Sequence, residues 1–507
     1  MSTFHGLEMA RQALSTQQSA LYTTGHNIAN ANTEGYSRQR VNFESASPYP
    51  AASRNQPVTA GQMGTGVEAG SVQRIRDEFL DHQYRAENSK EGYWETKSDA
   101  LSRMEGLMNE PSENGLSNTM DQFWESLQDL SVNPESSGER SVAVQRGVAV
   151  AENFNYLSES LDSIRSDLKN QIDQTEEEVN SLLNQIDNIN EQVKQTEVNG
   201  NVANDLYDER DRLIDELSNV INIKVSYSKS AESAPDVADG LATIEIVDDK
   251  GNSLGVKLVD AEADEDERVN ELEVNYADND SEEVTSVTVG EEPVEIMGSN
   301  GSLKGLVEAY GYESEDEDNE TAGIYTDMLS DLDDMADVFA TEFNDVHSNG
   351  YDLNGETDAD FFNFEDNAAA SSIVVSDYLV QEPDKLAASE DENAGNGDNA
   401  SNLAEVFNKT NLESDALGPG TSINGFYESL IADMGVIAQE ANRMTNNTGA
   451  LKSQVENQRM SVSAVSLDEE MSNMIKFQHA YSAAARSMTA VDELLDQVIN
   501  NMGLVGR

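Results

Sequence analysis

Apolar residues recur every seven positions near both ends of the chain. The stripe near the N-terminus consists of Leu7, Leu14, Leu21 and Ile28. The C-terminal stripe is longer and consists of Leu467, Met474, Tyr481, Met488, Leu495 and Met502, with Phe477, Ala484, Val491 and Val498 three residues after its middle members. Paired apolar positions sustained over several heptads are typical of a coiled-coil seam.

A lone amphipathic helix leaves its apolar stripe exposed to water and is marginally stable without a partner surface. We therefore expect the two terminal helices to pair with each other or with neighbouring copies of the chain. The alternative is that both helices pack on an ordinary core.

Between the ends, three- and four-residue apolar spacings predict helices over most of residues 80–220. Turn-forming residues predict breaks in this helical stretch at Glu110-Pro111, at Asn133-Pro134 and at Asn199–Asn201. Residues 221–300 have a different pattern, because apolar and polar residues alternate there with period two. This alternation predicts strands at 221–225, 242–247 and 284–289.

Helical spacing returns at 302–307 and across Met328–Phe343, and a turn-rich stretch follows from Asn349 to about Asn424. Another long helix is expected from about Gly425. The predicted fold is mainly α with an inserted β domain, in an elongated and nested multi-domain chain. The expected domains are a terminal coiled-coil domain of 1–65 and 461–507, a discontinuous helical rod domain of 66–220 and 301–460, and a small β domain of 221–300.

The charge of the chain limits its partners. The 507 residues carry a net charge of −66, from 97 acidic and 31 basic residues. Nucleic acid and anionic membrane surfaces repel such a polyanion, so we expect neither as a partner. Because salt screens repulsion between carboxylates, the acidity favours a halophilic or salt-tolerant source, and added NaCl should then raise the melting temperature. The alternative is acidity confined to one solvated domain, but the acids are spread along the chain.

The residue inventory contains little that could support catalysis. The chain has no cysteine, and its five histidines are scattered without metal-ligand spacing. The sequence Gly64–Ala69 fits a dinucleotide-binding pattern but lacks the hydrophobic strand that must precede it, and Asp352–Glu356 has its glycine too early for an EF-hand. No apolar run is long enough to span a bilayer, and the first residues do not form a cleavable signal. We therefore expect no enzyme activity, no cofactor and no dedicated metal site.

Five collinear segments carry a resemblance to a known family. Asn27–Val41, with the letters NIANANTEGYSRQRV, resembles the signature of flagellar rod, hook and hook-associated proteins. The segments that follow in order are Gly64–Leu80, Asn204–Ser218, Phe343–Gly355 and Val462–Arg486. Together they resemble the hook-associated protein 1 family, the hook–filament junction proteins. Residues 225–300 and 355–420 carry little of this likeness.

The resemblance implies a structural protein of the bacterial flagellum that leaves the cell unfolded through the flagellar type III export channel. It implies a homo-oligomeric ring of about eleven subunits, with hook protein below, another hook-associated protein above and an export chaperone for the termini. The expected assembly interface consists of Leu7, Leu14, Leu21, Asn27, Ile28, Asn30, Gly35, Tyr36, Arg38, Leu467, Met474, Phe477, Tyr481, Met488, Val491, Leu495 and Val498. We expect the terminal helices to be disordered in the free subunit and to fold as they dock on the hook.

Three other functions are compatible with parts of the sequence. The chain could be another flagellar axial protein, such as hook, distal rod or a different hook-associated protein. It could be an exported surface adhesin, although residues 221–300 offer only scattered aromatic residues for gripping a ligand. An enzyme is the third alternative and lacks any supporting ligand spacing.

Overall fold

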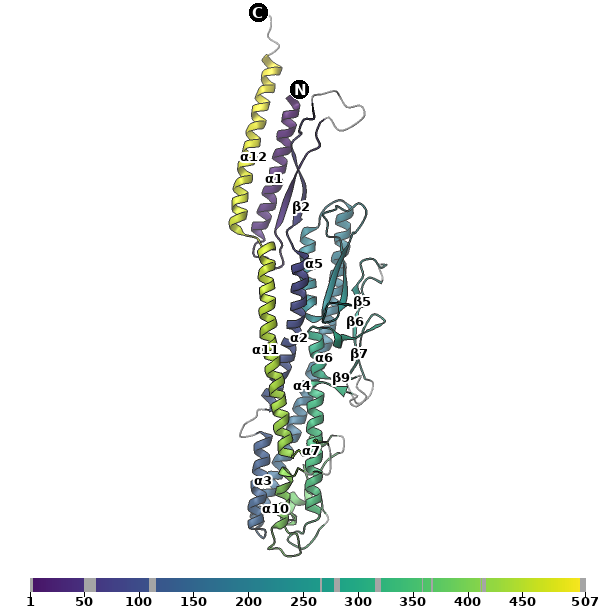
Figure 1. Ribbon diagram of the computed structural model, residues 1–507, viewed down its shortest axis with the longest axis vertical. Coiled ribbons are helices and arrows are strands. Elements are labelled where there is room, and N and C mark those ends of the chain that lie inside the picture. Colours follow the sequence, from purple (N-terminus) through teal and green to yellow (C-terminus); the bar gives the residue numbers. More distant parts are fainter. Residues whose placement is uncertain are drawn as a thin grey trace, which may run out of the picture. The chain divides into compact units, whose positions relative to one another are not determined.

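A computed structural model describes residues 3–49, 61–108, 115–264, 267–277, 283–314, 321–357, 359–365, 368–410, 412 and 416–501 (Figure 1). Most of these residues are helical, and the strands form small sheets. The chain divides into two compact units. Unit 1 comprises residues 1–89, 179–272 and 449–507, and unit 2 comprises 90–178 and 273–448.

Unit 1 contains both ends of the chain. Its elements are α1 (Thr3–Ala29), β1 (Gln39–Ser45), β2 (Val67–Arg74), α5 (Asn204–Val220), β3 (Ile223–Ser228), β4 (Leu241–Val247), β5 (Ser253–Val259), α12 (Leu467–Asp496) and a final π-helical turn, Gln497–Asn501. Strands β1 and β2 form an antiparallel hairpin with an irregularity between Asn42 and Phe43. Strands β3, β4 and β5 form an antiparallel sheet with β4 in its centre.

Unit 2 is built from helices and short strands. Its longer elements are α3 (Leu116–Val132), β7 (Val284–Val289), α6 (Ser302–Tyr310), α7 (Ile324–Ser348) and α10 (Asp398–Glu405). Its shorter elements are β8 (Glu292–Val294), η2 (Ile296–Gly298), β9 (Tyr312–Glu313), β10 (Thr321–Ala322), β11 (Phe362–Asn363), α8 (Ala369–Ser372), β12 (Val374–Val375), α9 (Asp377–Gln381), η3 (Pro383–Lys385) and η4 (Val406–Asn408). Four elements have residues in both units: α2 (Glu78–Met108), α4 (Ser137–Val198), β6 (Leu272–Tyr276) and α11 (Ile423–Ser463).

The periodicity predicted most elements correctly. The terminal helices are α1 and α12, and the breaks expected at Asn133-Pro134 and Asn199–Asn201 separate α3 from α4 and α4 from α5. The break expected at Glu110-Pro111 and the heptad position Met502 lie outside the described residues. The long helix expected from Gly425 is α11, which begins at Ile423.

The three predicted strands are β3, β4 and β7, but they belong to two sheets. Strands β3 and β4 lie in the three-stranded sheet of unit 1, whereas β7 pairs with β8 and β9 in unit 2. Alternation of apolar residues reveals a strand but says nothing about which sheet it joins. The division into three domains stays a prediction, since the two units partition the chain differently.

The core of unit 2 contains a cluster of phenylalanine rings. Phe123 of α3 and Phe343 of α7 have ring centroids 5.4 Å apart, and Phe361 lies 4.9 Å from Phe343. Gly147 of α4 is buried against this cluster: a Cβ atom there would lie 2.7 Å from the Phe361 ring and 3.3 Å from the Phe123 ring. A glycine thus lets the helix backbone approach the rings closely.

We expect Gly147→Ala to lower the free energy of unfolding by about 1–2 kcal/mol, because overpacking outweighs the gain in helix propensity. Gly435→Ala is the matched control. Gly435 is exposed in the interior of α11 with nothing within 4 Å of the added methyl, so this change should stabilise the chain by up to about 1 kcal/mol. Urea denaturation measures both, and a stabilising Gly147→Ala would contradict the packing of this core.

His347 of α7 is buried and bonded on both ring nitrogens. Its Nδ1 lies 2.6 Å from the Ala359 carbonyl oxygen, and the Ala387 N–H donates to Nε2 over 3.1 Å. Nε2 must therefore accept and Nδ1 must donate, which describes a neutral imidazole. Burial lowers the pKa of His347 to about 4, against 6.5 for a free side chain.

The depressed pKa of His347 makes stability dependent on pH. Between pH 6.5 and 4 the unfolded chain takes up a proton that the folded chain does not, so this contribution is complete above pH 6.5 and is lost as the pH falls. From pH 7.5 to 5 the expected loss is about 2 kcal/mol. Asp331, whose pKa burial raises to about 6, acts in the opposite direction.

Other titrating groups, such as Asp331, are present in both His347→Gln and the native chain. The difference between the two chains therefore reports the pH dependence that is due to His347 alone. Denaturant titrations at the two pH values should give a smaller pH-dependent loss for the variant. Equal losses in the variant and the native chain would show that His347 can be protonated in the folded state.

Candidate assembly interface

The first and last helices of the described chain pack against each other within unit 1. Helix α1 lies alongside α12, and the β1–β2 hairpin also packs on α1 (Figure 1). A Cβ atom added to Gly6 of α1 would lie 3.6 Å from the Val491 side chain of α12. At the other end of the pair, the rings of Phe43 in β1 and Phe477 in α12 have centroids 5.9 Å apart.

The residues expected in the seam differ in burial. Those that are at least half-covered in the single chain are Leu7, Leu14, Leu21, Ile28, Met474, Phe477, Met488, Val491 and Leu495. Three members of the C-terminal stripe are exposed instead: Leu467 at 47%, Tyr481 at 39% and Val498 at 42%. The packed face of α12 therefore passes through Ala480 rather than Tyr481, and part of the stripe is uncovered.

Small residues form the most buried face of α1, which the leucine pattern did not reveal. The buried residues are Ala10, Thr16, Ala20, Thr23, Thr24 and Asn27. Thr16 donates from its hydroxyl to the Val67 carbonyl oxygen of β2 over 3.0 Å. Small side chains allow the hairpin backbone to approach the helix, so α1 uses its leucines on one face and its small residues on another.

The signature segment is organised around the amide of Asn27. Its Oδ1 accepts from the Tyr36 hydroxyl over 2.8 Å and from the Gln39 N–H over 3.0 Å. Its Nδ2 donates to the Gln39 carbonyl oxygen over 2.9 Å and to Glu470 Oε2 of α12 over 3.2 Å. One buried side chain thus ties the end of α1 to the start of β1 and the start of α12.

The turn between α1 and β1 places the next residues against other parts of unit 1. Gly35 has φ +77°, the left-handed conformation expected for a glycine at this turn. The Arg38 N–H donates to the Ser463 carbonyl oxygen at the end of α11 over 2.8 Å, and its guanidinium pairs with Glu469 over 2.6 Å. Asn30 bonds back to the His26 carbonyl oxygen over 3.2 Å. The expected residues Asn27, Tyr36 and Arg38 are therefore brought together.

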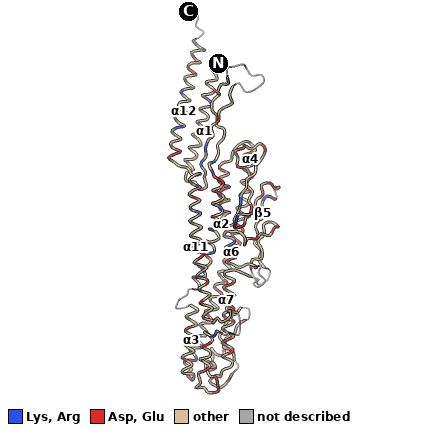
Figure 2. The backbone as a smooth tube through the Cα atoms, in the orientation of Figure 1, with Lys and Arg blue, Asp and Glu red and all other residues tan. Residues whose placement is uncertain are grey.

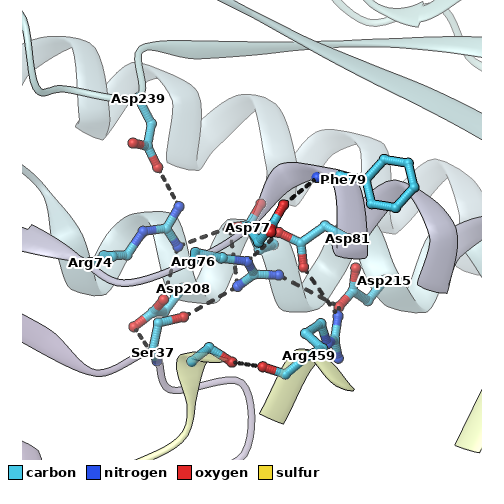
Figure 3. A network of polar contacts seen from close by, with 12 residues as sticks. Ser37, Arg74, Arg76, Asp77, Phe79, Asp81, Asp208, Asp215, Asp239 and Arg459 are labelled. Atoms are coloured by element: carbon cyan, nitrogen blue, oxygen red, sulfur yellow. Dashed lines mark hydrogen bonds and ion pairs between the residues drawn. The ribbon is translucent and has the colours of Figure 1, made fainter. Parts of the chain in front are cut away.

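Helix α5 supplies a row of carboxylates to the same region. Asp208, Asp211 and Asp215 are spaced by three and four residues, which places them on one helix face. The Ser37 N–H donates to Asp208 Oδ2 over 3.0 Å, so the row begins next to the signature turn (Figure 3). All three carboxylates are at most 14% exposed.

Four arginines from other segments neutralise this row. Arg74 pairs with Asp208 over 2.8 Å and with Asp239 (Figure 3). It also pairs with Asp211 over 2.8 Å. Arg85 of α2 pairs with Asp215 over 2.8 Å and Asp211 over 3.3 Å. The remaining two arginines are Arg76, which pairs with Asp81 over 2.6 Å and Asp211 over 3.3 Å, and Arg459 of α11, which pairs with Asp215.

Opposing effects set the charge state of this network. Burial raises the pKa of Asp211, but the guanidinium groups of Arg76, Arg74 and Arg85 outweigh it and hold that pKa far below its usual range. The same carboxylates raise the pKa of Arg76 despite its burial. Asp211 and Arg76 are therefore both charged, whereas burial raises the pKa of Asp208. Four of the five family-like segments, all except Phe343–Gly355, lie in unit 1 together with this network.

The aspartates and arginines of this network were not among the interface residues expected from the sequence. A signal for them was present in the sequence, because Asp208, Asp211 and Asp215 share a helix face and Arg74 and Arg76 occur in another family-like segment. In so acidic a chain, however, carboxylate spacing alone does not single out a buried set.

The described part of the chain offers no group of three or more histidine, aspartate or glutamate side chains arranged to hold a metal ion. The Asp352 carboxylate instead accepts from the N–H groups of Asn354 and Glu356, over 2.7 and 2.8 Å, within its own turn. Among the described residues, no helix combines the length and apolar character that a membrane crossing requires.

Comparison with family models gives matches along most of the chain. The model for the helical domain of the flagellar hook-associated protein FlgK matches residues 101–362. A flagella basal body rod protein model matches 7–36, and a model of the C-terminal part of the flagellar basal body rod proteins FlgEFG matches 456–502. The terminal segments are thus similar to those of rod proteins.

Comparisons over the whole chain agree with the match of residues 101–362 to the FlgK helical domain. The flagellar hook-associated protein 1 of Bacillus subtilis strain 168 is 48% identical over 516 residues, which cover 100% of both chains. That of Escherichia coli K12 is 23% identical, over 97% of this chain and 98% of the relative. The flagellar hook junction protein FlgK from Burkholderia pseudomallei has a similar fold, with a TM-score of 0.60 at 12% identity over 75% of this chain and 100% of that one.

Proposed function

Because the chain belongs to the flagellar hook-associated protein 1 family and is a structural component of the flagellum, we propose that it forms the junction between hook and filament. The observation that supports this role most directly is the pairing of α1 with α12. Two helices from opposite ends of a chain, packed together and still partly exposed, form a unit that further copies can extend. The role is mechanical and involves no catalysis.

In the proposed assembly, copies of the chain form a closed ring through their terminal helices. These helices form a coiled-coil inner layer of residues 1–65 and 461–507, and the helical rod and β domains lie outside it. Hook protein is the partner below and another hook-associated protein the partner above. The chain reaches this place unfolded, through the flagellar export channel, with a chaperone covering its termini until then.

Exposed apolar residues on α12 support assembly through this helix. Met471 is 57% exposed, Ile475 54% and Leu494 59%, in addition to the exposed stripe members Leu467 and Val498. Burying apolar surface yields roughly 25 cal/mol per Å², so covering this face offsets the entropy lost when the helices become ordered. We propose that docking on the hook tip and folding of the termini are one coupled event.

Electron microscopy of cells lacking this chain, with an assay for flagellin in the medium, tests the junction role. We expect complete hooks without filaments, and flagellin released as monomers. Absent hooks would instead identify a hook or rod protein, a second candidate that the rod-type matches at 7–36 and 456–502 leave open. Normal filaments would overturn a role in the flagellar axis.

Limited proteolysis of the soluble subunit tests the coupling of folding to docking. We expect the protease to remove residues of α1 and α12 and to leave the rest of the chain intact. Termini that resist cleavage in the monomer would show that the helices fold before assembly.

The acidic surface is proposed to reflect assembly in a salty medium. Carboxylates lie along the whole described chain, and basic residues are fewer (Figure 2). Repulsion between neighbouring copies weakens when salt shortens the screening length, which is about 10 Å at 0.1 M and about 3 Å at 1 M. A halophilic or salt-tolerant source accounts for this composition.

A further inference from the structure

A cleft of about 480 Å³ lies in unit 1 between α1, β1 and the first turns of α12. The signature segment and the rest of β1 form one wall, through Arg38, Arg40 and Phe43, and α12 forms the other, through Lys476 and Phe477. The volume is that of a few side chains, so the cleft can take a short peptide segment or the tip of a loop.

The cleft gathers basic side chains in an otherwise acidic chain. Arg40 and Lys476 are exposed, and within the described residues no carboxylate oxygen lies within 4.0 Å of either charged group. Arg38 has the Glu469 carboxylate 2.6 Å away, and Glu470, which also lines the cleft, is bonded to Asn27. Acidic residues outnumber basic ones by 97 to 31 in this chain, so two exposed cations on one cleft without a carboxylate at ion-pair distance favour an anionic occupant.

The cleft also has an apolar side. Phe43 is 43% exposed, and its ring packs at 62° against the half-buried ring of Phe477. Val41, which is 7% exposed, also lines the cleft. Aromatic rings beside cationic groups form the kind of site that a desolvated peptide segment occupies, with carboxylates at its edge.

We propose that this cleft binds an acidic segment of a second copy of the chain, in the ring described above. The inference rests on the proposed function, since the cleft lies between the helices that would form the inner layer. The chain itself is the acidic partner that charge complementarity requires, because a neighbour with net charge −66 presents carboxylates over its surface. The contact offsets, at one place, the repulsion that two such copies otherwise feel.

Charge reversal within the cleft tests the proposal in cells. The variant Arg40→Glu/Lys476→Glu should reduce the fraction of cells with filaments at least about tenfold, since like charges across an interface cost several kcal/mol. The loss should be largest at low salt, where screening is weakest. The control, Arg103→Glu/Arg146→Glu, changes the net charge equally at two exposed helix positions of unit 2 and should leave filament formation within about twofold of native.

Two measurements make these results interpretable. Circular dichroism and thermal unfolding of the purified variants must match those of the native chain, so that lost filaments do not report misfolding of the part of the chain that folds before docking. Native filament numbers in a folded Arg40→Glu/Lys476→Glu strain would overturn the cleft as an interface. The junction role would be untouched, because it is judged separately from cells that lack the chain.

A cross-linking experiment identifies the occupant. The chain has no cysteine, so Lys476→Cys introduces a single thiol that a photoactivatable reagent can label on isolated hook–filament junctions. Mass spectrometry should find cross-links to a glutamate- or aspartate-rich peptide of this same chain, and the yield should fall in the Arg40→Glu background. Cross-links to a different protein, to a peptide without acidic residues, or only within one copy would overturn the proposal.

Discussion

Replacing Asp211 with asparagine is expected to lower the free energy of unfolding by about 3–5 kcal/mol, the largest loss of stability among the changes considered. The Asp211 side chain is 2% exposed and lies between three arginines, with Arg74 at 2.8 Å and Arg76 and Arg85 at 3.3 Å. The Tyr227 hydroxyl also donates to it, over 3.0 Å. Without the charge, buried guanidinium groups lose their shared counterion.

The matched control for this substitution is Asp236→Asn. Asp236 also forms an ion pair, with Lys229 over 3.1 Å, but its side chain is 98% exposed. Water and salt screen such a pair, so the control should change stability by less than about 1 kcal/mol. Denaturant unfolding of both variants and of the native chain gives the comparison, and equal losses in the two variants would show that the network of unit 1 is solvated.

The response to acid follows from the same network. The arginines depress the pKa of Asp211, so its contribution is present above the ordinary aspartate value of about 4 and is lost as the pH falls through the folded-state value. The advantage of the native chain over Asp211→Asn should therefore be full at pH 7 and shrink on acidification. An advantage that did not change down to pH 2 would mean that Asp211 takes up its proton equally in the folded and unfolded states, so that folding does not depress its pKa.

Replacing Met488 with aspartate is expected to abolish incorporation of the chain into the flagellum while leaving unit 2 folded. Met488 is half-buried on the face of α12 that packs along α1, three residues before Val491, which contacts Gly6. A carboxylate there must be desolvated without a partner when the helices pair, and this cost opposes docking. Electron microscopy of the complemented deletion strain measures the result as the loss of filaments.

The neighbouring substitution Thr489→Asp separates this effect from charge and helix propensity. Thr489 is exposed on the same helix, so the new carboxylate stays in water. Filaments should form in this strain. Normal incorporation of the Met488→Asp chain would place the seam on another face of α12.

Much of the local structure could be predicted from the spacing of apolar residues. Heptad spacing predicted α1 and α12, and Asn133-Pro134 separated α3 from α4, because these signals act over one or two turns of chain. The β1–β2 hairpin was missed: its strands begin at Gln39 and Val67 and expose many of their residues, so neither shows a clear alternation. The pairing of β7 with β8 and β9 also could not be predicted, since it depends on which sheet edge is free.

In the candidate assembly interface, too, the sequence revealed local motifs but not the contacts between distant segments. Gly35, Tyr36 and Arg38 stood out as a motif, but nothing in the motif indicated that Asn27 would bond to Glu470, 443 residues away. Heptad counting assigns Tyr481 to the seam, and its place in an assembly interface stays a prediction. It is 39% exposed because Ala480 faces the packed side in this helix pair.

The sequence by itself determined the helices, the family and the absence of cysteine chemistry, because these depend on residue type and on spacing along the chain. Only the tertiary structure decided which charges are buried. Asp211 and Asp236 are both aspartates paired with a basic residue, yet one is 2% exposed and the other 98%. The contribution of an ion pair to stability depends on how much water surrounds it. In a chain with 97 acidic residues, the fold and not the composition decides which carboxylates are shielded from water.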